Sequence, residues 1–217
     1  MIFAKKHRST YGQATNLLIR EDRQVQKFNK YMATKSAIMG VADKQKASFE
    51  KLSKEFGYKN SMAAPHLVKV NVSVSTGSSM KRDKKFNDLV LDRLSKITGQ
   101  RATIRKAKMS VASFKTREGD PIGVAVTLRG ARMFGFLDKV LNVSLPRTKD
   151  FRGLNRTSVD DIGNMTFGIK EHTIFPEIKD EELKDVFGMA ITLGTTAKTK
   201  EEATKFFELI GIPFKKA

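Results

Sequence analysis

The sequence predicts an α+β fold in which helices pack on one face of a β-sheet and leave the other face open. Four segments alternate apolar and polar residues, the pattern of a half-buried strand, and four others carry apolar residues at helical spacing. Because successive strand residues point to opposite faces, the polar positions of the alternating segments must lie on the face away from the core.

The first predicted helix carries apolar residues at helical spacing up to Phe56 and ends at Gly57. The first strand covers residues 66–74, with polar residues at most odd positions. We expect its core face to hold Val68, Val70, Val72 and Val74. A second helix follows, capped by Asp83 and ended by Gly99.

Next comes a strand with several Lys and Arg residues, then a basic loop and a second apolar strand. The residues that this strand is expected to bury are Ile122, Val124, Val126 and Leu128. The following helix stops before Pro146, because the residue preceding a proline disfavours the helical conformation. Residues 165–169 and 189–193 alternate again as strands, and Thr199 with Glu202 forms a capping box for the last helix.

The composition limits what this chain can do. With 217 residues, of which 40% are hydrophobic, the chain suits one domain with a short appendage. Cysteine is absent, which excludes disulfides, thiolate zinc sites and cysteine nucleophiles. No apolar run approaches the ~18 residues of a membrane-spanning helix, so we expect no membrane partner.

The charge favours a polyanionic partner. A net charge of +18 and a pI of about 10.1 concentrate phosphate-bearing polymers through Coulomb attraction and counterion release. Cations are most evenly spaced between Gly99 and Leu154, where only four acidic residues interrupt them. These acidic residues are Glu118, Asp120, Asp138 and Asp150.

Residues 1–42 are interpreted as a basic N-terminal extension. They contain eight Lys or Arg residues, two acidic residues and few large apolar ones, a composition typical of a flexible arm. Two other interpretations stay open: the stretch up to Arg20 resembles an organellar presequence, and Met32 could be the true start. The globular domain is expected to cover residues 43–217.

Strand parity predicts the polar side chains of the open face, which are Lys69, Asn71, Ser73, Thr127 and Arg129. Such a face is either an RNA platform or an ordinary solvated sheet surface. The basic loop from Arg105 to Arg117 offers the same two alternatives. It carries one aromatic residue, Phe114, and no acidic residue before Glu118, which favours contact with phosphates and ribose hydroxyls.

An enzyme is not expected. The three histidines, His7, His66 and His172, are far apart and lack the spacing of metal ligands. The hydroxyl residues among the cations have no nearby histidine to activate them. We therefore predict neither a catalytic site nor a cofactor.

Many short motifs resemble large-subunit ribosomal protein five, the 5S-rRNA-binding protein of the central protuberance. The motifs that carry this resemblance are Gly99-Gln100, Ala107 to Ser110, Phe114 to Gly123, Val126 to Gly130, Leu145 to Leu154, Gly163-Asn164, Ile174 to Ile178, Thr195 to Thr199 and Ile212 to Lys216. They occur in order and span most of the chain beyond the extension.

The resemblance implies an antiparallel sheet with helices on one face and a structural role in the large ribosomal subunit. Its implied partners are 5S rRNA, large-subunit rRNA, peptidyl-site tRNA and neighbouring ribosomal proteins, including a small-subunit head protein. Motif matching places 5S rRNA contacts on Ser73, Gln100 and Thr127. The loop before Pro121 is implied to reach the tRNA.

The full predicted site combines both lines of reasoning. The residues expected to bind 5S rRNA are Lys69, Asn71, Ser73, Gln100, Arg101, Thr103, Arg105, Lys106, Lys108, Ser110, Thr127 and Arg129. The residues expected to contact tRNA are Phe114, Lys115, Thr116 and Arg117, and two others expected to face RNA are Arg147 and Arg152.

The chain departs from the family pattern at several of these places. Ser73 and Ser75 stand where the family has Asn and Gly, so one hydroxyl replaces a two-sided amide and close backbone approach is limited. Ala102 replaces a Pro, Met109 a Lys and Ile162 an Arg. The basic extension is a candidate compensation for this lost charge.

The competing function is an extra-ribosomal chaperone or regulator that binds 5S rRNA or mRNA on the same scaffold. The ribosomal role places the protein on cytoplasmic ribosomes, with an organellar ribosome as the alternative.

Overall fold

The computed structural model describes residues 39–77, 86–149, 151–178 and 186–215. The chain divides into two units, residues 1–39 and residues 40–217, and every element described below lies in the second. Most of the predicted N-terminal extension and the predicted cap at Asp83 lie outside the described residues.

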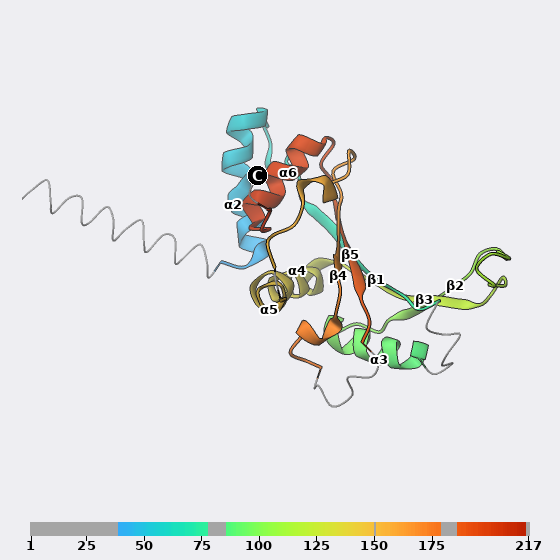
Figure 1. Cartoon of the computed structure of the whole chain (residues 1–217). Helices are drawn as coiled ribbons and strands as arrows, with labels where there is room; N and C mark the ends of the chain where they lie inside the picture. Colours follow the sequence, from blue (N-terminus) through green and yellow to red (C-terminus); the bar gives the residue numbers. More distant parts are fainter. Residues whose placement is uncertain (1–38, 78–85, 150, 179–185, 216–217) are drawn as a thin grey trace, which may run out of the picture. The chain divides into compact units, whose positions relative to one another are not determined.

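Helices and strands follow one another along the second unit (Figure 1). The main elements are α2 (Val41–Phe56), β1 (Leu67–Ser75), α3 (Phe86–Thr98), β2 (Thr103–Lys106), β3 (Pro121–Leu128), α4 (Gly130–Lys139), α5 (Leu145–Arg147), β4 (Met165–Ile169), β5 (Met189–Thr195) and α6 (Lys200–Ile210). The shorter turns are η1 (Ser61–Ala63), the π-helical η2 (Val140–Ser144), η3 (Arg156–Ser158) and η4 (His172–Ile174).

The five strands form one antiparallel sheet in the order β2-β3-β1-β5-β4. The registers Val72↔Val126 and Val72↔Ile191 place apolar side chains of the three central strands in one row on the same face. β1 therefore lies at the centre of the sheet, paired with strands from both halves of the sequence.

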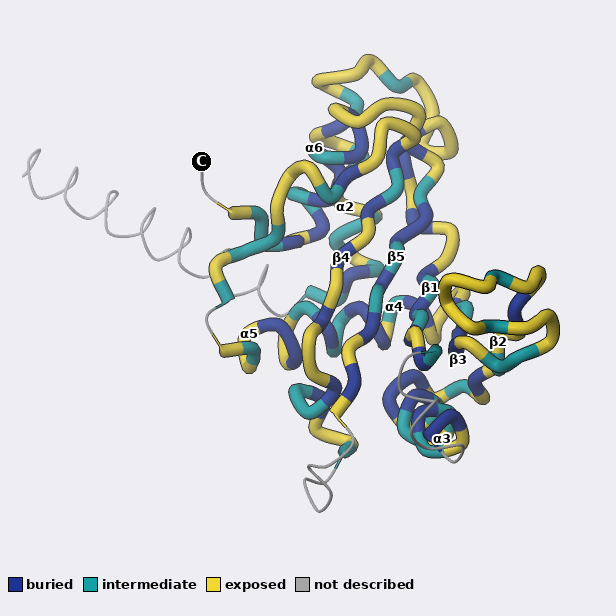
Figure 2. Tube along the Cα trace, turned by 45° about the vertical axis from the view of Figure 1, so that its right-hand side comes forward, coloured by how far each residue is buried: buried dark blue, intermediate teal, exposed yellow. Residues whose placement is uncertain are grey.

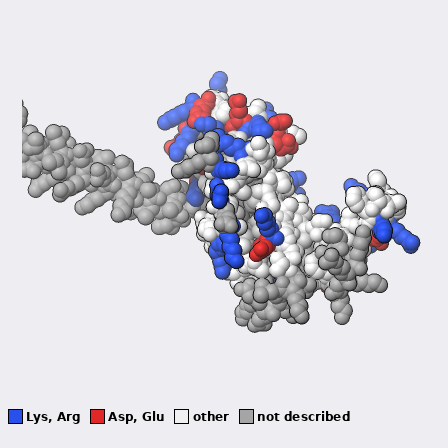
Figure 3. Space-filling model, in the orientation of Figure 1, with Lys and Arg blue, Asp and Glu red and all other residues white. Residues whose placement is uncertain are grey.

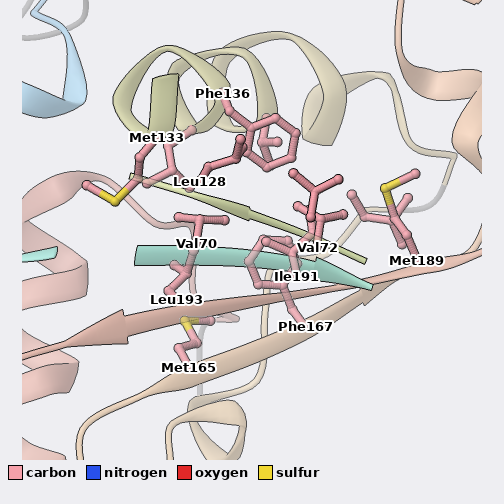
Figure 4. Close-up of a cluster of buried hydrophobic side chains, with 14 of the residues drawn as sticks. Val70, Val72, Leu128, Met133, Phe136, Met165, Phe167, Met189, Ile191 and Leu193 are labelled. Carbon is pink, nitrogen blue, oxygen red and sulfur yellow. The ribbon is translucent and has the colours of Figure 1, made fainter. Parts of the chain in front are cut away.

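The core lies between this face of the sheet and the helices. Val70, Val72, Leu128, Ile191 and Leu193 point towards α4 and are almost completely buried (Figure 4). Contacts join α3 to β2 and β3, α4 to β1 and α2, and α2 to α6. Buried and exposed positions alternate along the strands, most regularly along β4 (Figure 2). The predicted α+β class, with an antiparallel sheet and helices, is confirmed.

Two predicted core positions are wrong, and a β-bulge explains each. A register shift between Leu67 and Lys69 turns Leu67 into the core and leaves Val68 43% exposed. A second shift, between Arg105 and Lys106 opposite the start of β3, leaves Ile122 36% exposed. Each bulge breaks the period of two at a strand end, where parity from sequence stops being reliable.

The prediction that the fourth helix stops before Pro146 is also wrong. The chain stays helical from α4 through η2 and α5 to Arg147. In η2 the backbone N–H of Leu145 bonds to the carbonyl of Val140, five residues earlier. This π-helical turn admits Pro146 at the start of α5, where its missing N–H costs little.

The last helix begins as predicted at Thr199, whose hydroxyl accepts from the backbone N–H of Glu202. The return bond of a capping box differs, because the Glu202 carboxylate accepts from the N–H of Lys198 and from the Tyr58 hydroxyl. Glu202 therefore ties α6 to the chain that follows α2.

Candidate nucleic-acid interface

Polar side chains form a row across the sheet on the face away from the core. Thr127 pairs with Asn71, Asn71 with Thr192, and Thr192 with Thr166, so the row crosses β3, β1, β5 and β4. All four residues are partly or fully exposed. We call these residues the polar row.

Hydrogen bonds fix the polar row. The Thr127 hydroxyl donates to Asn71 Oδ1 at 3.1 Å, and the Thr166 hydroxyl donates to that of Thr192 at 3.1 Å. Gln100 Nε2 donates to the backbone carbonyl of Thr127 at 3.1 Å, which joins the end of α3 to the same row. The polar groups are held in place before any partner arrives.

Electrostatics favours an anionic partner on this face. None of the five strands contains Asp or Glu, whereas β1 and β2 carry Lys69, Arg105 and Lys106. In Figure 3 the acidic side chains of the visible face gather mainly over α2 and α6, away from the sheet. Negative charge is thus concentrated on helices and positive charge on the sheet.

A hollow of about 440 Å³ opens at one end of the polar row. Its lining residues, here called the sheet hollow, are Lys69, Asn71, Thr127, Arg129, Asn164, Thr192 and Gly194. The set contains two cations, two amides and two hydroxyls, and no acidic or large apolar side chain. Such a surface suits a polar, negatively charged ligand.

The predicted residues fall into three groups in the structure. Strand pairing places Ser73, Thr103 and Arg105 on the same face as the polar row and the sheet hollow, and Gln100 bonds to it directly. Arg101 is exposed where the chain enters β2. These residues form a continuous candidate surface.

The second group lies in the hairpin loop between β2 and β3, which extends beyond the sheet (Figure 1). Lys108, Ser110, Lys115 and Arg117 are exposed there, and Phe114 is 69% exposed. The bridge Val111↔Thr116 and a 2.7 Å bond from the N–H of Arg117 to Asp120 Oδ2 order the loop. Lys115 has a φ of 51°, which is left-handed and unusual for a residue with a side chain.

The third group, Arg147 and Arg152, lies apart from the first two. Arg147 borders a hollow of about 360 Å³ together with residues after β4, the edge strand opposite β2. Nearby, Leu154 pairs with Phe214 through the bonds Leu154 N–H to Pro213 carbonyl (2.7 Å) and Lys215 N–H to Leu154 carbonyl (2.8 Å). The C-terminal segment thus holds the chain just after Arg152.

Sequence reasoning missed four residues of the open face: Asn164, Thr166, Thr192 and Gly194. The even positions of β4 and β5 carry a signal that parity could have found, because they alternate with buried residues in both strands. Asn164 carries no such signal. Its place depends on the bond from the Thr195 N–H to its Oδ1, at 3.2 Å, which joins residues 31 positions apart.

Within the described ranges, no group of three His, Asp or Glu residues is arranged to hold a metal ion. In the same part of the chain, each helix is too short or too polar to cross a membrane.

Comparison with known proteins identifies the family. The model of ribosomal protein L5 matches residues 60–117, and a second model, of the C-terminus of the same ribosomal protein family, matches residues 121–214. The large ribosomal subunit protein uL5 of Mesoplasma florum is 50% identical over 165 residues, which cover 76% of this chain and 91% of that relative. Those of Halothermothrix orenii and Campylobacter hominis are each 49% identical, over 76% and 75% of this chain and 91% and 90% of the relatives. The chain belongs to the ribosomal protein L5 family, whose members are structural proteins of the large ribosomal subunit.

Proposed function

We propose that this protein binds 5S rRNA through the open face of its sheet and seats it in the central protuberance of the large subunit. The observation that carries the proposal is the polar row, held by hydrogen bonds on a sheet without acidic residues. Family membership supports a ribosomal RNA as the partner. The same membership identifies a structural protein, not an enzyme.

The chemistry of the open face matches folded RNA. Lys69, Arg105 and Arg129 supply salt-dependent contacts to phosphates, which position the RNA without reading its sequence. The hydroxyls of Thr127, Thr192 and Thr166 both donate and accept hydrogen bonds, as a ribose 2′-OH does. The open face therefore favours RNA over DNA.

Further contacts are proposed for the other two groups of residues. The hairpin, with Phe114, Lys115, Thr116 and Arg117 at its end, is proposed to contact peptidyl-site tRNA. Arg147 and Arg152 are proposed to face large-subunit rRNA. We further propose a contact with a small-subunit head protein, on cytoplasmic ribosomes, and an N-terminal extension over residues 1–42 that precedes the 5S-rRNA-binding domain.

Binding of the full chain to 5S rRNA over a range of salt concentrations tests the proposal. A steep fall of the binding constant with salt, together with a preference for 5S rRNA over unrelated RNA of the same length, is expected. Equal affinity for both RNAs would contradict it. Retention on large subunits washed at high salt would separate the ribosomal role from a free chaperone, which the wash would remove.

A further inference from the structure

The sheet hollow presents hydrogen-bond donors in unusual excess. Asn164 must direct its carbonyl oxygen at the Thr195 N–H, which can only donate, so its amide N–H₂ group remains for a ligand. Asn71 Oδ1 accepts from the Thr127 hydroxyl, and its N–H₂ group is likewise left. Lys69 and Arg129 add only donors.

Two like charges border this hollow. The ladder between β1 and β3 pairs Val70 with Leu128, so Lys69 and Arg129 follow directly opposite each other, one step beyond. Like charges at opposed positions destabilise a sheet. Among the described residues no ion pair reaches either side chain. An anion bound between them would remove the repulsion.

Gly194 keeps the hollow open. A Cβ atom at this position would lie 3.1 Å from Cγ and 3.4 Å from Cε of Lys69. The stem of Lys69 therefore runs over the bare backbone of β5, within the hollow. Any larger residue at position 194 would displace the Lys69 side chain without changing the charge of the protein.

We propose that the sheet hollow binds one phosphodiester group of the bound RNA. Lys69 and Arg129 neutralise its charge, and the amide groups of Asn71 and Asn164 donate hydrogen bonds to its oxygens. Phosphate accepts hydrogen bonds and offers none, which matches a donor-only site, whereas a base edge combines donors and acceptors. The inference rests on the proposed function and adds the ligand group and the roles of Asn164 and Gly194.

The decisive variants are Asn71→Asp and Asn164→Asp in the full chain. Each keeps the oxygen that accepts the internal hydrogen bond but replaces the free N–H₂ group with a carboxylate oxygen. Asn142→Asp, on exposed η2, is the control, because it changes the net charge equally at a distant place. We expect each hollow variant to weaken 5S rRNA binding about tenfold or more, through loss of a charge-assisted bond and added repulsion, and the control to change it less than about twofold.

A second variant tests the hollow without altering charge. Gly194→Val should weaken binding while the thermal unfolding temperature shows that the protein remains folded. In addition, one 5S rRNA phosphate, when replaced by an uncharged methylphosphonate, should weaken binding to the wild type but weaken binding to Lys69→Gln much less.

The outcomes separate the two proposals. If Asn164→Asp and Asn142→Asp have equal effects, or if no single phosphate behaves as described, the phosphate site is wrong. If Thr103→Val and Arg105→Gln, outside the hollow, still weaken binding, the proposed function stands without it. Failure of the wild type to prefer 5S rRNA would overturn the proposed function itself.

Discussion

The hydroxyl of Thr127 on β3 and the amide of Asn71 on β1 are joined by a 3.1 Å hydrogen bond across the open face. Their backbones are paired in the sheet, and the Thr127 carbonyl also accepts from Gln100. One residue is thus held from two sides while its own side chain stays partly exposed. An ordinary solvated sheet surface does not need such fixation, but a recognition surface gains from it, because less side-chain freedom is lost on binding.

Thr127→Val keeps the shape of the side chain and removes its hydroxyl. We expect 5S rRNA binding to weaken by about 1–3 kcal/mol, because RNA polar groups would face a methyl group and Asn71 would lose its internal partner. Isothermal titration calorimetry measures the effect. Thr127→Ser, which keeps the hydroxyl, should bind nearly as wild type; if it is as weak as Thr127→Val, the hydroxyl is not the contact.

Asp138 on α4 stabilises the start of α2 from a distance. Its Oδ1 accepts a 2.8 Å hydrogen bond from the N–H of Val41, the first residue of a helix whose own N-cap, Gly40, offers no side chain. Asp138→Ala should lower the free energy of unfolding by about 1 kcal/mol, as loss of a helix cap does. Denaturant unfolding measures this, and Asp138→Asn, which keeps an acceptor oxygen, should recover most of the loss.

Tyr58 links stability to alkaline pH. Burial, and then the hydrogen bond to Glu202 and the charge of that carboxylate, raise the pKa of Tyr58 above its ordinary value. The folded state therefore holds this proton more tightly than the unfolded state. The resulting stability is fully present below the unfolded pKa of about 10 and is lost as pH rises through the folded pKa.

Tyr58→Phe should consequently be less stable than wild type at neutral pH by about 1 kcal/mol, since the buried Glu202 loses a donor. The difference between the two proteins should shrink as pH rises above about 10. Unfolding curves of both proteins, measured in parallel, remove the background of titrating lysines. A difference that stays constant with pH would show that the Tyr58 proton is not linked to folding.

The hairpin loop should affect tRNA and leave 5S rRNA binding largely unchanged. Lys115→Gln with Arg117→Gln removes two exposed cations from the loop. Ribosomes carrying this variant should release peptidyl-site tRNA faster, because phosphate contacts are lost, while their 5S rRNA content stays normal. The matched control is Lys51→Gln with Lys54→Gln on α2, which should not change the release rate.

The N-terminal extension should contribute non-specific electrostatic affinity. Deleting residues 1–31 removes seven Lys or Arg residues and two acidic ones. We expect weaker 5S rRNA binding and a shallower dependence of the binding constant on salt, because fewer counterions are released. Unchanged affinity and salt dependence would count against compensation by this segment for the divergent Ser73 and Ser75.

Much of the fold and of the site follows from alternation in the sequence. Val70, Val72 and Val74 define one face of β1 by a period of two, and this alone places Asn71 and Ser73 on the other face. Thr127 follows in the same way. These predictions succeed because the centre of a strand is held by neighbours on both sides, which fixes its register.

The rest depends on contacts between distant residues. The bulges that expose Val68 and Ile122 arise from pairing with β5 and β2. The π-helical turn that admits Pro146 depends on hydrogen bonding rather than on local residue preference. Asn164 reaches the open face through a bond to Thr195, in another strand, which no local pattern announces.

The measurement that tests the central claim most directly compares 5S rRNA affinities of two matched triple variants of the full chain. One combines Lys69→Gln, Thr127→Val and Arg129→Gln on the open face. The other combines Lys51→Gln, Lys54→Gln and Thr157→Val at exposed positions outside the sheet, with the same loss of charge and hydroxyl. The open-face variant should bind at least about 100-fold more weakly than the other, while both unfold cooperatively. Equal affinities would contradict recognition of 5S rRNA by this face.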